Sequence, residues 1–195
     1  MFFRRKVSPV AWVIVFLGNP GIQYENTRHN VGFITADILA KEIGIGLKRI
    51  KFNALTETTT LAGEQVLLMK PQTYMNLSGN ALRQAVRFYK LPIEKVIVVS
   101  DETALPLGKL RIRRSGSSGG HNGLRDIISK CGEEFIRVRI GIGAPPHEGY
   151  DMADWVLSKI PDEDKEQINE AAKKAAAAID LIISNGVDKA IAKYN

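Results

Sequence analysis

The sequence predicts one α/β domain, built as a mixed, mostly parallel twisted sheet with helices on both faces. Short, continuously apolar runs recur along the chain, as expected of strands that are buried on both faces of a parallel sheet. Stretches with apolar residues at helical spacing lie between these runs. The 195 residues, of which 45% are hydrophobic and 25% charged, are enough to build one packed core.

The first half of the chain alternates strand and helix patterns. Residues 13–17 are all apolar and end at a turn of asparagine, proline and glycine. Residues 62–64 separate two strand-like runs, and a hairpin at this point makes the sheet mixed. The predicted elements are, in order, a buried strand over 13–17, a helix from 31 to Gly44, a hairpin with strands over 54–61 and 65–69, and a helix over 77–89 that Pro92 ends.

The second half continues this alternation. Residues 109–114 alternate between basic and apolar side chains, which is typical of a strand with one buried face. Pro161 is favoured at a helix start, and Gly186 stops the long alanine-rich pattern that follows it. The predicted elements are a strand over 96–99, a strand over 109–114, a Gly- and Ser-rich loop over 115–120, a helix over 124–130, a strand over 138–142, a long helix to 185 and a short terminal helix.

The N-terminus imitates a secretion signal, because basic residues precede an apolar run. The run is too short to span a bilayer and ends in a turn, not at a cleavage site. We therefore predict residues 1–11 to be a flexible extension and residues 12–195 to be one domain. The single cysteine, Cys131, cannot form an internal disulfide and gives no sign of an oxidising compartment.

Charge and missing motifs narrow the function. The net charge of +6 and the pI of about 9.4 favour a polyanionic partner, either a nucleic acid or an anionic membrane face. The dinucleotide-binding glycine motif, the P-loop and the nucleophile elbow of serine hydrolases are absent from the sequence. One cysteine and three histidines also argue against a zinc site.

Polar residues gather where the predicted strands end. Ligands of open α/β sheets bind beyond the carboxyl ends of the strands. We expect one histidine, one carboxylate and three carboxamides to share this rim: His29, Asp101, Asn19, Asn76 and Asn122.

These residue types suit hydrolysis by an activated water molecule. His29 can take a proton near neutral pH, and a carboxylate such as Asp101 can set its tautomer and stabilise its charged form. The carboxamides can bind a peptide backbone or donate to a developing oxyanion. Taken singly, each residue has another interpretation. His29 could be structural, Asn19 could shape its turn, Asp101, Asn76 and Asn122 could be caps, and His121 is interpreted as a loop residue.

Three segments, in this order and spacing, resemble the motifs of bacterial-type peptidyl-tRNA hydrolases. The first has Gly-Asn-Pro-Gly at 18–21, a tyrosine at 24 and Thr-Arg-His-Asn-Val-Gly at 27–32. The second is Lys-Pro-Gln-Thr-Tyr-Met-Asn-Leu-Ser-Gly at 70–79. The third is Gly-Gly-His-Asn-Gly-Leu-Arg-Asp-Ile-Ile at 119–128, followed by Arg-Val-Arg-Ile-Gly-Ile-Gly at 137–143. The resemblance runs from about Trp12 to the C-terminal helix.

The resemblance implies hydrolysis of the ester between a peptide and tRNA, without a cofactor or a metal, by a cytoplasmic monomer. His29 would activate water, and Asp101 would orient His29. Asn19, assigned to the catalytic group with them, would help to distinguish a blocked peptide nitrogen from a free amino group. The residues that would hold the peptide and the tRNA end are Tyr24, Tyr74, Asn76 and Asn122.

The basic strand resembles the family's clamp for the tRNA phosphate end. Side chains two residues apart share a face of a strand, so Lys109, Arg111 and Arg113 would form one basic face. Arg111, Arg113 and Arg139 are therefore predicted to bind tRNA, and Arg114 to lie beside the rim if Asn122 does. The alternative is a solvated edge strand that its charges protect from pairing.

Two departures keep a second hypothesis open. The family commonly has an acidic residue three positions after the aspartate, where this chain has Ala104, and its Gly/His-rich stretch is here Ser-Gly-Ser-Ser at 115–118. Relatives of the fold in plant organelles assist intron splicing without hydrolysis, so the chain could be an RNA-binding adaptor. An adaptor has no need for His29. A nucleoside phosphorylase on a similar sheet is the third hypothesis.

Overall fold

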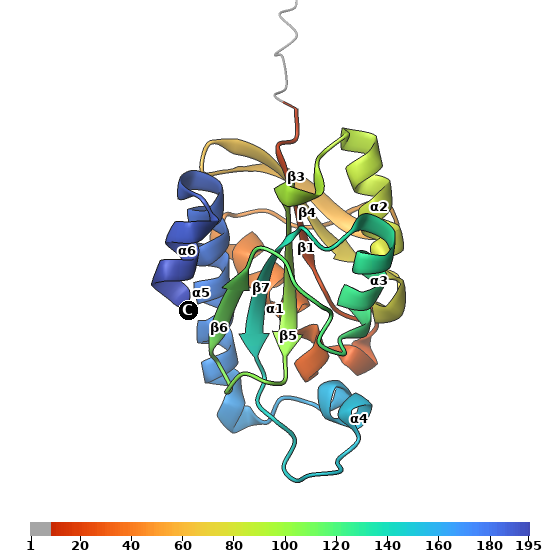
Figure 1. Cartoon of the computed structure of the whole chain (residues 1–195), viewed down its shortest axis with the longest axis vertical. Helices are drawn as coiled ribbons and strands as arrows, with labels where there is room; N and C mark the ends of the chain where they lie inside the picture. The colour runs from red at the N-terminus through yellow and green to blue at the C-terminus, as the bar shows by residue number, and fades with distance from the viewer. Residues whose placement is uncertain (1–8) are drawn as a thin grey trace, which may run out of the picture.

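The computed structural model describes residues 9–195, which form a seven-stranded sheet of order β2-β3-β4-β1-β5-β7-β6 with helices on both faces (Figure 1). The four central strands are mutually parallel, whereas the pairs β2–β3, β3–β4 and β6–β7 are antiparallel. The predicted α/β class and mixed sheet are confirmed, with parallel order confined to the centre of the sheet.

The elements follow the predicted order. The strands are β1 (Trp12–Phe16), β2 (Arg49–Lys51), β3 (Ala54–Leu61), β4 (Glu64–Pro71), β5 (Val96–Glu102), β6 (Leu110–Arg113) and β7 (Ile136–Gly141). The α-helices are α1 (Val31–Glu42), α2 (Ser78–Tyr89), α3 (Asn122–Cys131), α4 (Met152–Leu157), α5 (Asp162–Asn185) and α6 (Val187–Tyr194). Short 3₁₀ helices are η1 (Ile22–Tyr24), η2 (Arg28–Asn30), η3 (Met75–Leu77) and η4 (Ile93–Lys95).

The sheet separates two apolar cores, and β1 contributes to both. Ile14 and Phe16 pack in the core under α1, α5 and α6, whereas Val13 and Val15 pack in the core under α2 and α3. Figure 1 shows these two groups of helices on opposite sides of the sheet. Successive side chains of a strand point to opposite faces, so a strand that is buried on both sides must be apolar throughout.

Gly32 brings the start of α1 against the backbone just after β1 and in the middle of β5. A Cβ at this position would stand 2.3 Å from the carbonyl oxygen of Leu17 and 2.9 Å from that of Val99. Both contacts are with backbone, which cannot move aside as a flexible side chain can. The η2 turn directly before α1, which carries His29, is therefore held at the carboxyl edge of the sheet.

The sequence did not predict β2 or α4. Both are short, with three and six residues. A strand or helix of this length shows too few repeats of its hydrophobic pattern to be distinguished from a loop. Residues 1–8 of the predicted extension lie outside the described residues, while Val10 is buried and the Ala11 N–H donates to the Gln65 carbonyl at 2.7 Å. The division into residues 1–11 and 12–195 stays a prediction. Within residues 9–195, none of the helices has the length and apolarity that crossing a membrane requires.

Candidate active site

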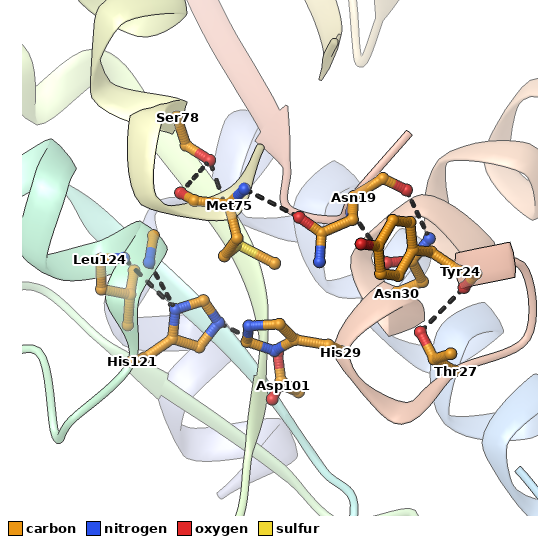
Figure 2. Close-up of polar contacts among 11 residues, drawn as sticks. Asn19, Tyr24, Thr27, His29, Asn30, Met75, Ser78, Asp101, His121 and Leu124 are labelled. Atoms are coloured by element: carbon orange, nitrogen blue, oxygen red, sulfur yellow. Dashed lines mark hydrogen bonds and ion pairs between the residues drawn. The ribbon is translucent and has the colours of Figure 1, made fainter. Parts of the chain in front are cut away.

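His29 and Asp101 meet at the carboxyl edge of the sheet (Figure 2). His29 lies in η2, and Asp101 lies near the end of β5. The Nδ1 atom of His29 is 2.9 Å from Oδ1 of Asp101, and the two side chains are 8% and 2% exposed. The predicted contact between them is confirmed.

This contact fixes which nitrogen of His29 can act as a base. An ionised carboxylate only accepts hydrogen bonds, so Nδ1 of His29 must carry the hydrogen that it donates to Asp101. The other ring nitrogen, Nε2, is then unprotonated and keeps its lone pair. A histidine held in this tautomer can take a proton from a water molecule at Nε2.

His121 is a third member of the cluster, and the sequence interpretation as a loop residue missed it. Its Nε2 lies 3.0 Å from the same Oδ1 of Asp101. Its Nδ1 accepts hydrogen bonds from the backbone N–H groups of Gly123 and Leu124, at 3.1 and 3.3 Å, and so caps α3. Because Nδ1 is an acceptor, Nε2 carries the hydrogen and donates it to Asp101. Histidine is not a preferred N-cap residue, so the sequence contained little signal for this role.

Charge attraction outweighs burial in setting the proton affinities of this group. Burial alone would lower the pKa of His29, but the charge of Asp101 and the hydrogen bond to it raise that pKa above its usual value of 6.5. Burial alone would raise the pKa of Asp101, but His29 and His121 hold it well below its usual range. Asp101 is therefore ionised at neutral pH, and it makes His29 a stronger base.

The same three side chains are the candidate metal ligands within the described residues, with ligand atoms within 4.8 Å of one another. Nδ1 of His29 and Nε2 of His121 are both hydrogen-bonded to Oδ1 of Asp101. Two ligands of a tetrahedral zinc, each about 2.0–2.1 Å from the ion, stand roughly 3.3 Å apart, which is wider than the 2.9 and 3.0 Å separations from Asp101. The geometry is that of a hydrogen-bonded group, and the predicted absence of a metal or cofactor stays a prediction.

A cavity of about 240 Å³ opens in front of this group. His29, Asp101, His121 and Asn122 line it. α4 also lines it, through Met152, Ala153 and Val156. The predicted convergence of Asn122 with His29 and Asp101 is confirmed, but the apolar wall from α4 was not predicted.

Arg28, the neighbour of His29, ties α4 to η2. Its guanidinium donates to Ser158 Oγ at 2.9 Å and to the Lys159 carbonyl at 2.7 Å. It also lies 3.9 Å from the ring centre of Trp155 in α4, which is close enough for a cation–π interaction. The wall of the cavity is thus joined to the turn that carries the histidine.

Asn19 connects the turn after β1 to the start of η3. Its side-chain oxygen accepts from the Met75 N–H at 2.8 Å, and its backbone is paired with the side chain of Asn30 at 2.8 and 2.9 Å (Figure 2). These bonds leave the Asn19 amide NH₂ for another partner. Asn19 also lines a second groove, of about 310 Å³, with Asn30, Lys70 and other polar residues. The sequence had not indicated the role of Asn30.

Of the other predicted substrate residues, Asn122 lines the catalytic cavity, whereas Tyr24, Tyr74 and Asn76 line neither of these two grooves. Tyr24 is half-buried in η1, and Tyr74 is 58% exposed directly before η3. Asn76 is exposed within η3, and Asn122 is the first residue of α3. Leu77 and His121, not these asparagines, occupy the N-cap positions of α2 and α3, so the interpretation of Asn76 and Asn122 as helix caps is wrong.

The basic face of β6 is confirmed. Arg111 and Arg113 are exposed, and they alternate with buried Leu110 and Ile112. The expected position of Arg114 beside the rim is wrong, because β6 runs antiparallel to β7 and moves away from Asp101. Arg114 forms an ion pair with Asp188 of α6.

Arg139 is placed differently from the other two predicted clamp arginines. It lies opposite Arg111 in the sheet, but it is half-buried and forms an ion pair with Glu102 at 2.8 Å. Glu102 also accepts from the Ala104 N–H at 3.1 Å, so it orders the turn in which this chain has alanine. Arg139 donates to the Ser117 carbonyl at 3.3 Å and thereby supports the loop above the cavity.

The model of the family described as "Peptidyl-tRNA hydrolase" matches residues 13–195. The chain belongs to the peptidyl-tRNA hydrolase family. Membership of the peptidyl-tRNA hydrolases identifies it as a hydrolase, which favours the first hypothesis over the RNA-binding adaptor and the nucleoside phosphorylase.

Individual peptidyl-tRNA hydrolases agree with this over nearly the whole chain. The protein of that name from Caldanaerobacter subterraneus is 52% identical over 185 residues, which cover 94% of this chain and 99% of the relative. The one from Lachnospira eligens is 42% identical with the same coverage. The crystal structure of peptidyl-tRNA hydrolase from Acinetobacter baumannii matches with a TM-score of 0.89 and 36% identity, and it covers 97% of each chain.

Proposed function

We propose that this chain hydrolyses the ester bond between a peptide and tRNA, with His29 as the base that activates water. The observation that carries the proposal is the hydrogen bond from His29 Nδ1 to buried Asp101, which leaves Nε2 as the proton acceptor at the wall of a cavity. Membership of the peptidyl-tRNA hydrolase family supports this choice of substrate.

The reaction needs one proton transfer in each direction. Water loses a proton to Nε2 of His29 as its oxygen attacks the ester carbonyl, and the imidazolium is stabilised by Asp101. The tetrahedral intermediate then releases the ribose oxygen of tRNA, which takes the proton back from His29. The products are a peptide carboxylic acid and free tRNA. Asn122, which lines the cavity, is the candidate to donate to the oxyanion or hold the tRNA end.

Asn19 is the candidate for holding the blocked peptide nitrogen or a neighbouring carbonyl. Asn19→Asp keeps the oxygen that accepts from Met75 but replaces the NH₂ donor by a charged oxygen. We expect kcat/KM to fall about tenfold or more, because one hydrogen bond contributes roughly 1–1.5 kcal/mol. The charged oxygen that the variant introduces would also repel a substrate carbonyl oxygen. Steady-state kinetics on an N-acetylated aminoacyl-tRNA measure it. Asn185→Asp, which is exposed at the end of α5, is the matched control, and equal losses in both variants would exclude Asn19.

Arg111 and Arg113 are proposed to bind tRNA phosphates from the exposed face of β6. We expect the double variant Arg111→Gln/Arg113→Gln to bind deacylated tRNA more weakly, and its plot of log Kd against log salt to be flatter by about 1.4–1.8, since each lost phosphate contact removes a slope of roughly 0.7–0.9. Filter binding at several salt concentrations measures both. Arg114→Gln is the control because Arg114 is already paired with Asp188. An unchanged slope in the double variant refutes the clamp.

A single-turnover assay tests the proposed function itself. Purified protein in excess over N-acetylated aminoacyl-tRNA should release the N-acetylated amino acid, with free tRNA as the other product. Tight tRNA binding without release is the result that the adaptor hypothesis predicts, and it would overturn the proposal. The cytoplasmic location and monomeric state that the family resemblance implies stay predictions, and sedimentation of the purified chain tests the second of them.

A further inference from the structure

A further polar groove lies against α2, separate from the catalytic cavity and from the groove that Asn19 lines. It has a volume of about 350 Å³, and the residues that line it, here called the α2 groove, are Asn53, Asn80, Arg83, Gln84 and Arg87. Two guanidinium groups and three carboxamides line it, with no carboxylate among them. Guanidinium and amide N–H groups are the donors that proteins use to contact phosphate oxygens.

The positive charge of the α2 groove is not neutralised by a partner. Among residues 9–195, neither Arg83 nor Arg87 has a carboxylate within 4.0 Å, whereas other surface cations such as Lys165 and Lys173 do. Burial raises the pKa of Cys131, and the positive charges of Arg83, Lys130 and Arg87 each oppose that rise. Lys130 of α3 is therefore near the same thiol as the two arginines. Lys130 itself is paired with Asp126. Within the described residues, neither arginine of the α2 groove is therefore paired with a carboxylate.

An aromatic cluster borders the α2 groove. Phe88, directly after Arg87, is 60% exposed and lies 5.4 Å from Phe52 and 4.9 Å from Tyr89, measured between ring centres. Lys51 Nζ stands 3.8 Å from the centre of the Phe88 ring. Phe52 and Asn53, with φ of +56° and +53°, are the two central residues of the hairpin turn between β2 and β3, a turn that requires positive φ at both positions. The turn places the Phe52 ring beside that of Phe88.

The α2 groove begins close to the catalytic rim. Residues 80, 83, 84 and 87 recur at intervals of three and four, so they form one face of α2. The helix follows η3, which carries Asn76, and Arg87 lies eleven residues beyond Asn76, or about 16 Å along a helix at 1.5 Å per residue. α2 covers the side of the sheet near β4, while β6 is at the far edge. Arg83 and Arg87 are thus separate from Arg111 and Arg113.

We propose that the α2 groove is a second tRNA-binding surface, which contacts the sugar-phosphate backbone outside the esterified end, with a base able to stack against Phe88. This rests on the proposed function. Free guanidinium groups beside an exposed aromatic ring are the combination that binds RNA without reading its sequence. An acidic peptide would use the cations but has no need of the aromatic ring.

The test compares two substrates of one enzyme. The variant Arg83→Glu/Arg87→Glu is assayed with full-length N-acetylated aminoacyl-tRNA and with the same ester on a short 3′-terminal oligonucleotide. We expect KM for the full-length substrate to rise at least about fivefold, with kcat and the kinetics of the short substrate unchanged, because two phosphate contacts are lost. Phe88→Ala should raise the same KM by a smaller factor.

The control is Lys173→Glu/Lys174→Glu, which makes the same change in net charge on the exposed face of α5, on the other side of the sheet. If both double variants raise KM equally, or if the short substrate is affected as much as the long one, the α2 groove is not a binding surface. Affinity for deacylated tRNA is measured in parallel. An inactive wild type would refute the proposed function, whereas an unchanged tRNA affinity in Arg83→Glu/Arg87→Glu would refute this inference alone.

Discussion

Replacing His29 by alanine is expected to lower kcat for hydrolysis of an N-acetylated aminoacyl-tRNA by roughly 10²–10⁴-fold, the usual contribution of a positioned general base. His29 is the member of the cluster whose Nε2 is left unprotonated by the bond to Asp101, since His121 presents its hydrogen to the same oxygen. The tRNA affinity should change little, because the proposed phosphate contacts are made by exposed arginines elsewhere on the surface.

Single-turnover release of the labelled N-acetylated amino acid measures the effect of His29→Ala, and filter binding measures tRNA affinity. His147→Ala is the matched control, because His147 is exposed and its ring bonds only to the neighbouring Glu148 carbonyl in the described structure. Hydrolysis by His29→Ala at the wild-type rate would remove His29 from the role of base. A loss of tRNA binding together with activity would point to a misfolded variant, which thermal unfolding would reveal.

Replacing Asp101 by asparagine is expected to lower kcat by a similar factor, roughly 10²–10⁴-fold. One oxygen of Asp101 accepts from both histidines, so an asparagine carbonyl can keep both hydrogen bonds while the negative charge is lost. The loss of activity then reports mainly on the charge that stabilises the imidazolium formed when His29 takes a proton. Asp101→Ala, which also removes the bonds, should lose at least as much activity.

The pH dependence of Asp101→Asn separates a role through His29 from a merely structural role. Burial opposes the positive charge of His29, but Asp101 outweighs burial and raises its pKa above 6.5. Activity requires neutral His29, so wild-type kcat/KM should fall as the pH decreases through this raised pKa. Without the charge of Asp101, burial dominates and the pKa of His29 decreases. The acidic limb of the pH–rate profile should therefore move to lower pH in Asp101→Asn, and an acidic limb that stays in place contradicts the assigned role.

The proposed division of labour explains why the cluster contains two histidines with different surroundings. The Nδ1 atom of His121 accepts hydrogen bonds from the first turn of α3, so its Nε2 carries the hydrogen that it donates to Asp101. His29 leaves its second nitrogen at the cavity wall, where water can reach it. Two chemically identical side chains thus receive different roles from the hydrogen bonds made by the opposite side of each ring.

The sequence by itself determined the order of the elements and the strand ends at which polar residues gather. Runs such as residues 13–17 and 96–99 could be recognised because a strand that is buried on both faces must be apolar at every position. Asp101 follows such a run, and Asn19 follows another, so their placement at one edge needed only the rule for the carboxyl ends of parallel strands. The catalytic assignment of His29 drew mainly on the resemblance of the three motifs.

Only the tertiary structure decided which side chains make contact at that edge. His121 and Asp101 are separated by 20 residues and His29 and Asp101 by 72, and no local pattern encodes a ring orientation set by packing across such distances. The α4 wall has too few turns to show a period, and Arg28 reaches it only because the chain folds residues 158–164 against η2. β6 runs away from the rim because it pairs antiparallel with β7. The alternation of basic and apolar side chains could not predict this direction, since a pattern of period two is the same in both directions.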